Sequence, residues 1–194
     1  MHHAKLILAS ASPRRLALLE QVGIKPLKIV PADIDEAVRP DELARAHALR
    51  IATSKANAVR EKQPFGEALT ILAADTVVAC GRRILPKAED DQTVARCLRL
   101  LSGRRHTVLT ALAIVDQTGK MRTRLCETKV AFRRLDEREI AEYCVSREGL
   151  GKAGGYAIQG HAAVFVRFIS GSYSNVVGLP LMETFQMLRA CSAI

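Results

Sequence analysis

Near the N-terminus the sequence runs Lys5-Leu-Ile-Leu-Ala-Ser-Ala-Ser-Pro-Arg-Arg15. Residues 6–9 are apolar without alternation, which is typical of a short strand buried on both faces. Pro13 suits the first helical position, because its missing N–H would have no partner there, and Ser12 before it is a natural N-cap. The segment therefore predicts a buried strand followed by a helix that ends near Gly23.

Polar groups gather where this strand gives way to the helix. They are the hydroxyls of Ser10 and Ser12 and the guanidinium groups of Arg14 and Arg15. Free backbone N–H groups and the positive end of a helix dipole attract anions, and arginine forks match phosphate oxygens. Cations are mildly unfavourable at this end of a helix, so two of them there need a reason. On this stretch alone a phosphate site and a solvated first turn both remain open.

Composition sets bounds on the protein. The 194 residues suffice for one large domain or two small lobes, and we expect a single domain over residues 1–194. Hydrophobic residues make up 48% and charged residues 25% of the chain, as in ordinary globular proteins. No run approaches the roughly 18 apolar residues of a membrane span, so no membrane association is expected.

The net charge of +9 favours a polyanionic partner. Aromatic residues make up only 4% and tryptophan is absent, which argues against a base-stacking platform for single-stranded nucleic acid. The five cysteines are odd in number and widely spread, without a Cys-x-x-Cys pair, so neither a zinc knuckle nor a redox motif is indicated. Reduced thiols and a cytoplasmic location are expected.

The rest of the chain mixes helical and strand patterns without strict alternation. Further strands are expected over residues 27–30, 70–80, 106–115, 121–132 and 164–169. Further helices are expected over residues 40–61, 90–101, 136–145 and 180–189. Turns or connectors are expected at residues 63–66, 81–83, 116–120, 150–160 and 171–179. This order predicts an α/β fold with a mixed twisted sheet and flanking helices, arranged either as one body or as two lobes.

Asp75 is the most informative single residue, because it interrupts the apolar strand pattern of residues 70–80. A carboxylate in such surroundings is costly to bury unless it is paired or bound to a metal. Strongly perturbed carboxylates concentrate at functional sites. We therefore favour a functional Asp75 over the alternative, an aspartate at a strand end that bonds to a turn.

Other polar residues are ambiguous when each is taken alone. Glu36 in an acidic loop, Lys55 in a long helix and Lys87 in a loop are most often surface residues. His106 follows a basic turn and could shuttle protons, although a structural role is more common. No His or Cys cluster has ligand spacing, so any metal would be a hard one held by carboxylates and phosphate.

Seven fragments, in this order along essentially the whole chain, together resemble the Maf family of nucleotide pyrophosphatases. They are Ser10-Ala-Ser-Pro-Arg-Arg15, Asp35-Glu36, Lys55-Ala56, Ala74-Asp-Thr-Val-Val78, Ser102-Gly-Arg104 with His106, Lys152-Ala-Gly154 through Gln159-Gly160, and Gly178-Leu-Pro-Leu181.

The resemblance implies a two-lobed α/β fold around a central cleft, shared with inosine-triphosphate pyrophosphatases, usually as a homodimer. It implies hydrolysis of a nucleoside triphosphate to the monophosphate and pyrophosphate, dependent on a divalent metal, Mg²⁺ or Mn²⁺. Asp75 would accept the proton of water, and Glu36 and Asp75 would hold the metal. The triphosphate would be gripped by Arg14, Arg15, Lys55 and Lys87, assisted by Ser10 and Ser12. Base specificity would fall to Arg14, Thr76 and Gln159.

Within the family, the sequence resembles the dTTP/UTP branch. The 7-methyl-GTP branch has a bulky residue between the proline and the paired arginines, whereas Arg14 follows Pro13 directly here. That branch also has Asp-Gln in place of Asp75-Thr76 and lacks the glutamine matching Gln159. The alternatives are 7-methyl-GTP or inosine-type housecleaning, or a non-enzymatic septum or cell-division regulator that binds nucleic acid. We do not expect nucleic acid as a partner.

Two positions depart from the family pattern. Gly151 stands where the family usually has an aspartate before Lys152, and Ala88 stands where a proline usually follows Lys87. Both lysines are present, so activity is expected.

Overall fold

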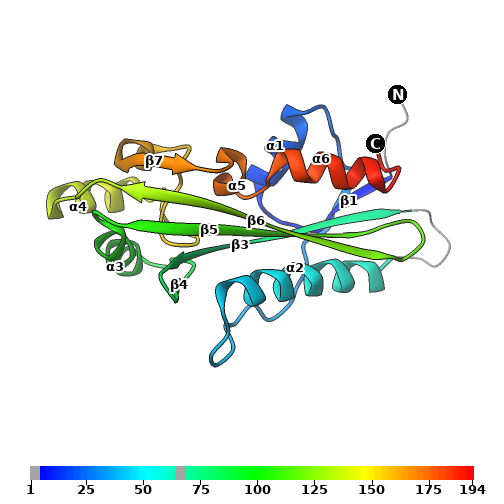
Figure 1. Cartoon of the computed structure of the whole chain (residues 1–194), viewed down its shortest axis with the longest axis horizontal. Coiled ribbons are helices and arrows are strands. Elements are labelled where there is room, and N and C mark those ends of the chain that lie inside the picture. Colours follow the sequence, from blue (N-terminus) through cyan, green and yellow to red (C-terminus); the bar gives the residue numbers. More distant parts are fainter. Residues whose placement is uncertain (1–4, 64–68) are drawn as a thin grey trace.

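A long twisted sheet runs through the molecule (Figure 1). The computed structural model describes residues 5–63 and 69–194. The seven strands are β1 (Leu6–Leu8), β2 (Lys28–Ile29), β3 (Thr70–Cys80), β4 (Arg83–Leu85), β5 (Arg105–Val115), β6 (Met121–Phe132) and β7 (Val166–Ser170). They follow the order β2-β1-β3-β5-β6-β7, with β4 also beside β3. Only β1 forms parallel pairs, with β2 and β3, so the predicted mixed sheet is confirmed.

Helices flank both faces of this sheet. They are α1 (Pro13–Gln21), α2 (Ala44–Glu61), α3 (Asp91–Leu101), α4 (Glu137–Ser146), α5 (Tyr173–Val177) and α6 (Leu181–Ala190), with the 3₁₀ helix η1 (His161–Phe165). Helix α2 packs alone on one face, where its alanines, spaced four apart, meet alanines of β3 and β5. The other helices cover the opposite face. The predicted α/β class is therefore confirmed.

The central strand β3 has one continuous neighbour and one interrupted edge. Strand β5 pairs with it throughout residues 71–79. On the other edge, β1 pairs only with residues 70–72 and β4 only with residues 78–80. Among the described residues, no strand therefore lies beside residues 73–77 on that edge. Because β1 also ends there, a loop and a helix start face the same opening, which is where open α/β sheets commonly bind ligands.

The two ends of the molecule carry different elements. In Figure 1, β1, α1 and α6 lie toward one end and α3, α4 and β7 toward the other, while β3, β5 and β6 span both. The gap on the edge of β3 lies between these two groups. This arrangement matches the predicted two-lobed form.

Several boundaries differ from the sequence prediction. Helix α2 begins at Ala44 rather than residue 40, because Asp41 has a left-handed backbone with φ of 55° that a helix cannot continue through. The turn expected at 81–83 ends early, since Arg83 already pairs with Cys80.

The C-terminal part differs as well. Residues 161–165 form a 3₁₀ helix, so β7 begins at Val166. Ser172 caps the short α5 where a turn was expected, and Pro180 is the N-cap of α6 rather than its first residue. Most of the connector predicted at 63–66 lies outside the described residues. All five cysteines are free thiols. Among the described residues, none of the helices has the length and apolar character needed to span a bilayer.

Candidate active site

A cleft of about 1080 Å³ opens at the interrupted edge of β3. Loops and helix starts from both ends of the molecule line it, so that the two groups of elements form its two sides. All ten residues predicted to act together line this one cleft: Ser10, Ser12, Arg14, Arg15, Glu36, Lys55, Asp75, Thr76, Lys87 and Gln159. The structure thus brings together residues that are far apart in the sequence.

Asp75 and Thr76 reach the cleft from opposite faces of the sheet. Successive residues of a strand point to opposite faces, so Asp75 lies on the side of α2 and Thr76 on the side of α1 and α5. Both can face one cleft because no strand covers this part of β3. The gap in the sheet is therefore what lets two adjacent residues serve the same site.

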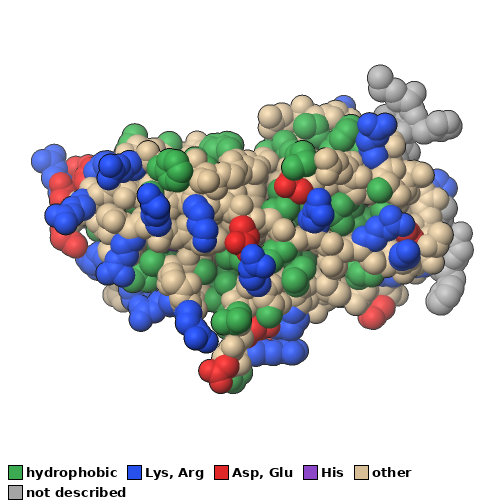
Figure 2. All heavy atoms as spheres, viewed as in Figure 1, with side chains coloured by type: hydrophobic (Ala, Val, Ile, Leu, Met, Phe, Trp, Pro, Cys, Tyr) green, Lys and Arg blue, Asp and Glu red, His purple; other side chains and the backbone are tan. Residues whose placement is uncertain are grey.

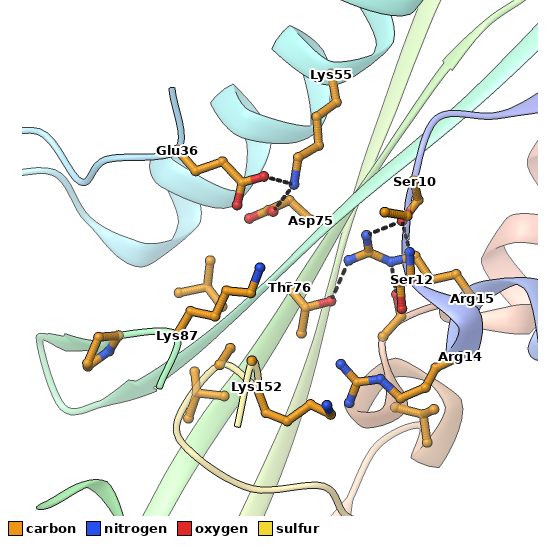
Figure 3. Close-up of a pocket in the computed structure, with 18 of the residues that line it drawn as sticks. Ser10, Ser12, Arg14, Arg15, Glu36, Lys55, Asp75, Thr76, Lys87 and Lys152 are labelled. Atoms are coloured by element: carbon orange, nitrogen blue, oxygen red, sulfur yellow. Dashed lines mark hydrogen bonds and ion pairs between the residues drawn. The ribbon is translucent and has the colours of Figure 1, made fainter. Parts of the chain in front are cut away.

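Lys55 links the two carboxylates of the site. Its Nζ lies 2.8 Å from Glu36 Oε1 and 2.8 Å from Asp75 Oδ1 (Figure 3). The side chains of Lys55 and Asp75 are only 10% and 11% exposed, whereas Glu36 is 45% exposed. Lys55 occupies the buried stripe of α2 between Ala52 and Ala56. A lysine on that apolar stripe was the signal that it is not a surface residue.

The pKa of Glu36 reflects this pairing. Burial raises the pKa, but the hydrogen bond and charge of Lys55, together with the charges of Lys87 and Arg15, outweigh burial and bring the pKa below its usual value. Glu36 is therefore an anion at neutral pH. The sequence alone favoured a solvated loop residue, whereas in the structure Glu36 is paired with Lys55.

Arg15 is buried and ties three segments together. Its Nε donates to Gly178 O at 2.9 Å, and its two terminal nitrogens donate to Ser10 Oγ at 3.0 Å and Thr76 Oγ1 at 3.2 Å. The Ser10 hydroxyl also accepts from the backbone N–H of Ser12. Ser12 occupies the N-cap position of α1, but its side chain makes no capping bond. Arg15 and Ser10 thus fix the strand-to-helix loop against β3 and α5.

Three cations on the other side of the cleft have no acidic partner within the described part of the chain. They are Arg14, Lys87 and Lys152. Burial, together with the charges of Arg14 and Lys87, lowers the pKa of Lys152, and burial lowers that of Arg14. The ends of Arg14 and Lys152 point toward each other in Figure 3. This crowding of like charges favours an anionic ligand.

Backbone pairing places Lys87 beside Lys152. Gly151 N donates to Ala88 O, Ala88 N donates to Lys152 O and Gly154 N donates to Pro86 O. Gly151 and Gly154 have φ of 67° and 70°, values that glycine adopts without strain. The two segments that contain the departures from the family pattern are therefore paired with each other. Lys152 was not among the predicted site residues, although the glycine-rich segment around it was the available signal.

His106 does not line the cleft. It is buried against Phe132 and Tyr156, and its Nε2 lies 2.8 Å from the Tyr156 hydroxyl. Burial lowers the pKa of His106 to about 4, so the ring is neutral at neutral pH. The structure gives it a supporting position beneath Tyr156, which does line the cleft, rather than access to a ligand.

The carboxylates of Glu36 and Asp75 fit a hard cation. Because both lie 2.8 Å from a single atom, Lys55 Nζ, they converge on one region of the cleft. Mg²⁺ is commonly held by one or two carboxylates together with substrate phosphates and water. In residues 5–63 and 69–194, no three His, Cys, Asp or Glu side chains form a group that could hold a metal.

Known proteins resemble this chain in sequence over most of its length. A dTTP/UTP pyrophosphatase of Rhodospirillum rubrum is 56% identical over 183 residues, covering 94% of this chain and 86% of the relative. One of Caulobacter vibrioides is 55% identical, covering 94% and 93%. The solved structure of a HAM1 protein from Coxiella burnetii is 16% identical, with a TM-score of 0.47 over 95% of this chain and 98% of that one. The model of the family described as Maf-like protein matches residues 5–191. The chain therefore belongs to the Maf family.

Proposed function

We propose that this protein hydrolyses dTTP and UTP to the monophosphate and pyrophosphate. The observation that carries the proposal is a single cleft in which two carboxylates face three cations, and these cations have no acidic partner among the described residues. The two carboxylates can bind a water molecule and a metal, and the three cations can bind a polyphosphate. The two bacterial relatives, both named dTTP/UTP pyrophosphatase, support the same substrates.

Asp75 is the base in this proposal. Its Oδ1 accepts from Lys55 Nζ at 2.8 Å, which leaves Oδ2 to take a proton from water. Oxygen of that water bonds to the α-phosphorus while the bond from this phosphorus to the β-phosphate oxygen breaks. Lys55 offsets the charge of a carboxylate that is otherwise expensive to bury. Proton transfer to a placed base typically contributes 10²–10⁴-fold in rate.

Glu36 and Asp75 would hold Mg²⁺ or Mn²⁺ together with phosphate oxygens. A bound divalent cation supplies Lewis acidity and neutralises phosphate charge. Glu36 is suited to this because it is ionised and half-exposed, so one of its oxygens can turn to a ligand while Lys55 balances its charge.

Arg14, Lys87 and Lys152 would bind the β- and γ-phosphates. Their charges stabilise the negative charge that grows on the departing pyrophosphate, an effect that is strong where water is partly excluded. Arg15 already donates to three protein acceptors, so it contributes mainly by fixing the loop and through its remaining N–H groups. Thr76, Gln159 and Arg14 line the same cleft and would select the base.

The test is pyrophosphate release from a panel of triphosphates with Mg²⁺ or Mn²⁺. We expect dTTP and UTP to be the best substrates and Asp75→Asn to lose about a thousandfold in rate. Asp90→Asn is the matched control, because it makes the same change at the N-cap of α3, where asparagine caps equally well. Preference for 7-methyl-GTP or inosine triphosphate would overturn the substrate, and full activity of Asp75→Asn would overturn the base.

A homodimer remains a prediction of the family resemblance. The mass of the protein in solution, measured by light scattering, is the direct check.

A further inference from the structure

Residues 30–43, which carry Glu36 to the cleft, form neither helix nor strand. Glu36, Ala37 and Val38 all line the cleft. A loop of this length loses considerable conformational entropy when it is fixed, and the single ion pair of the half-exposed Glu36 with Lys55 is a weak restraint by itself. The position of Glu36 therefore needs a second support.

That support is a nearly buried cluster centred on Glu42, whose side chain is 9% exposed. Glu42 Oε1 accepts from Arg50 Nε at 2.6 Å, and Oε2 accepts from the second Arg50 nitrogen at 2.7 Å. Oε2 also accepts from the backbone N–H of Arg39 at 3.1 Å and lies 2.9 Å from His47 Nδ1. Two parallel bonds from one guanidinium give both strength and a fixed orientation.

Arg50 extends the cluster to the residue beside Glu36. The nitrogen that binds Glu42 Oε2 also donates to Ala37 O at 2.9 Å. Ala37 N in turn donates to Asp35 Oδ1 at 2.9 Å, which closes a tight turn around Glu36. Arg50 and Lys55 both belong to α2, so one rigid helix holds the loop backbone with one side chain and the Glu36 carboxylate with another.

We propose that Glu42 and Arg50 are positioning residues that clamp this loop so that Glu36 stays next to Asp75. Neither needs to touch the substrate: Glu42 and Arg50 are outside the lining of the cleft, and their effect passes through the backbone of residues 37–39. The role in catalysis rests on the function proposed above, whereas the clamp itself is a property of the free protein.

A double-mutant cycle tests the route of the effect. Glu42→Gln should lower kcat/KM for dTTP about 30-fold in the wild-type background but less than threefold in the Glu36→Gln background, because coupled residues are not additive. The matched control is Arg45→Gln, which removes a charge from the exposed side of the same helix, where Arg45 pairs with Glu127. The control should stay within twofold of wild type. An equal loss in both backgrounds would overturn the proposal, since it would mean general damage.

Hydrogen exchange provides a readout that does not depend on activity. The amides of Ala37 and Arg39 should exchange at least tenfold faster in Glu42→Gln and Arg50→Lys than in wild type, and at the wild-type rate in Arg45→Gln. Arg50→Lys keeps the charge but loses the paired bonds, so it serves if Glu42→Gln folds poorly. Unchanged exchange in both variants would overturn the clamp. If the two amides exchange faster in these variants but the wild-type protein cleaves no triphosphate, the clamp is supported and the proposed function is rejected.

Discussion

On one side of the cleft each charged group has a partner of opposite sign, whereas on the other side three cations have none among the described residues. Lys55 lies between Glu36 and Asp75, and we call these three residues the paired side. Arg14, Lys87 and Lys152 form the cationic side. Both sides line one cavity of about 1080 Å³.

Burial explains the difference. Lys55 and Asp75 are nearly buried, and an unpaired charge there would lose its hydration without compensation. Lys87 is exposed and Arg14 and Lys152 are partly so, so water screens them while the cleft is open. The comparison teaches that the paired side is balanced within the protein, whereas the cationic side is balanced only when an anion binds. Substitutions should therefore harm stability on the first side and ligand binding on the second.

The largest effect is expected from Lys55→Met. The variant leaves the Asp75 carboxylate buried without its cation, which should lower the free energy of unfolding by about 3 kcal/mol and abolish activity. Urea unfolding measures the first and pyrophosphate release the second.

The double variant Lys55→Met with Asp75→Asn sharpens this test. Removing both charges should restore most of the lost stability but none of the activity. A Lys55→Met protein as stable as wild type would show that the pair contributes little, and the division between the two sides would fail.

A smaller effect, confined to binding, is expected from Lys87→Met. The KM for dTTP should rise about 10- to 100-fold, because a hydrogen bond to a charged group contributes about 1.5–3 kcal/mol. The free energy of unfolding should change by less than about 0.5 kcal/mol, since Lys87 is exposed. Lys120→Met, in the exposed turn between β5 and β6, is the control and should alter neither quantity. A stability loss in Lys87→Met without a change in KM would contradict the assignment.

The smallest effect is expected from Arg14→Ala on the choice of base. The ratio of kcat/KM for dTTP to that for dCTP should fall about tenfold, within the range that pocket contacts commonly supply. Steady-state kinetics with both nucleotides measures it. An equal loss for every nucleotide would make Arg14 a phosphate clamp like Lys87, and would move base selection to Thr76 and Gln159.

Much of the fold followed from local patterns. The apolar run of residues 6–9 and the proline at the start of α1 each predict an element from a few adjacent residues, and the structure contains both elements. The errors fell where a local signal was overridden. Pro40 suits a helix start, but the left-handed backbone of Asp41 and the bonds of Glu42 to the loop delay α2 until Ala44.

The candidate site was predictable as a set of residues but not as an arrangement. Asp75 was conspicuous because a carboxylate interrupts an apolar strand, and the strand-to-helix segment itself indicated Ser10, Ser12, Arg14 and Arg15 as a candidate phosphate site. The family resemblance supplied the remaining five residues. The sequence did not show which of these charged side chains form ion pairs with one another. Lys55 and Lys87 both resemble surface lysines in the sequence, yet the first is buried in an ion pair and the second is exposed without one.

The sequence by itself thus determined the strand and helix order, the family and the types of residue at the site. Those features depend on neighbours within a few positions or on motifs that stand in a fixed order. Only the tertiary structure decided which charges neutralise each other. The packing of α2 on the sheet brings Lys55 to Asp75, whereas the pairing of two loops places Lys87 opposite Ala153, next to Lys152 and without an acidic partner among the described residues. Residues that are far apart in the sequence meet in the cleft at the gap on the edge of β3, because β1 and β4 leave residues 73–77 of this strand open to it.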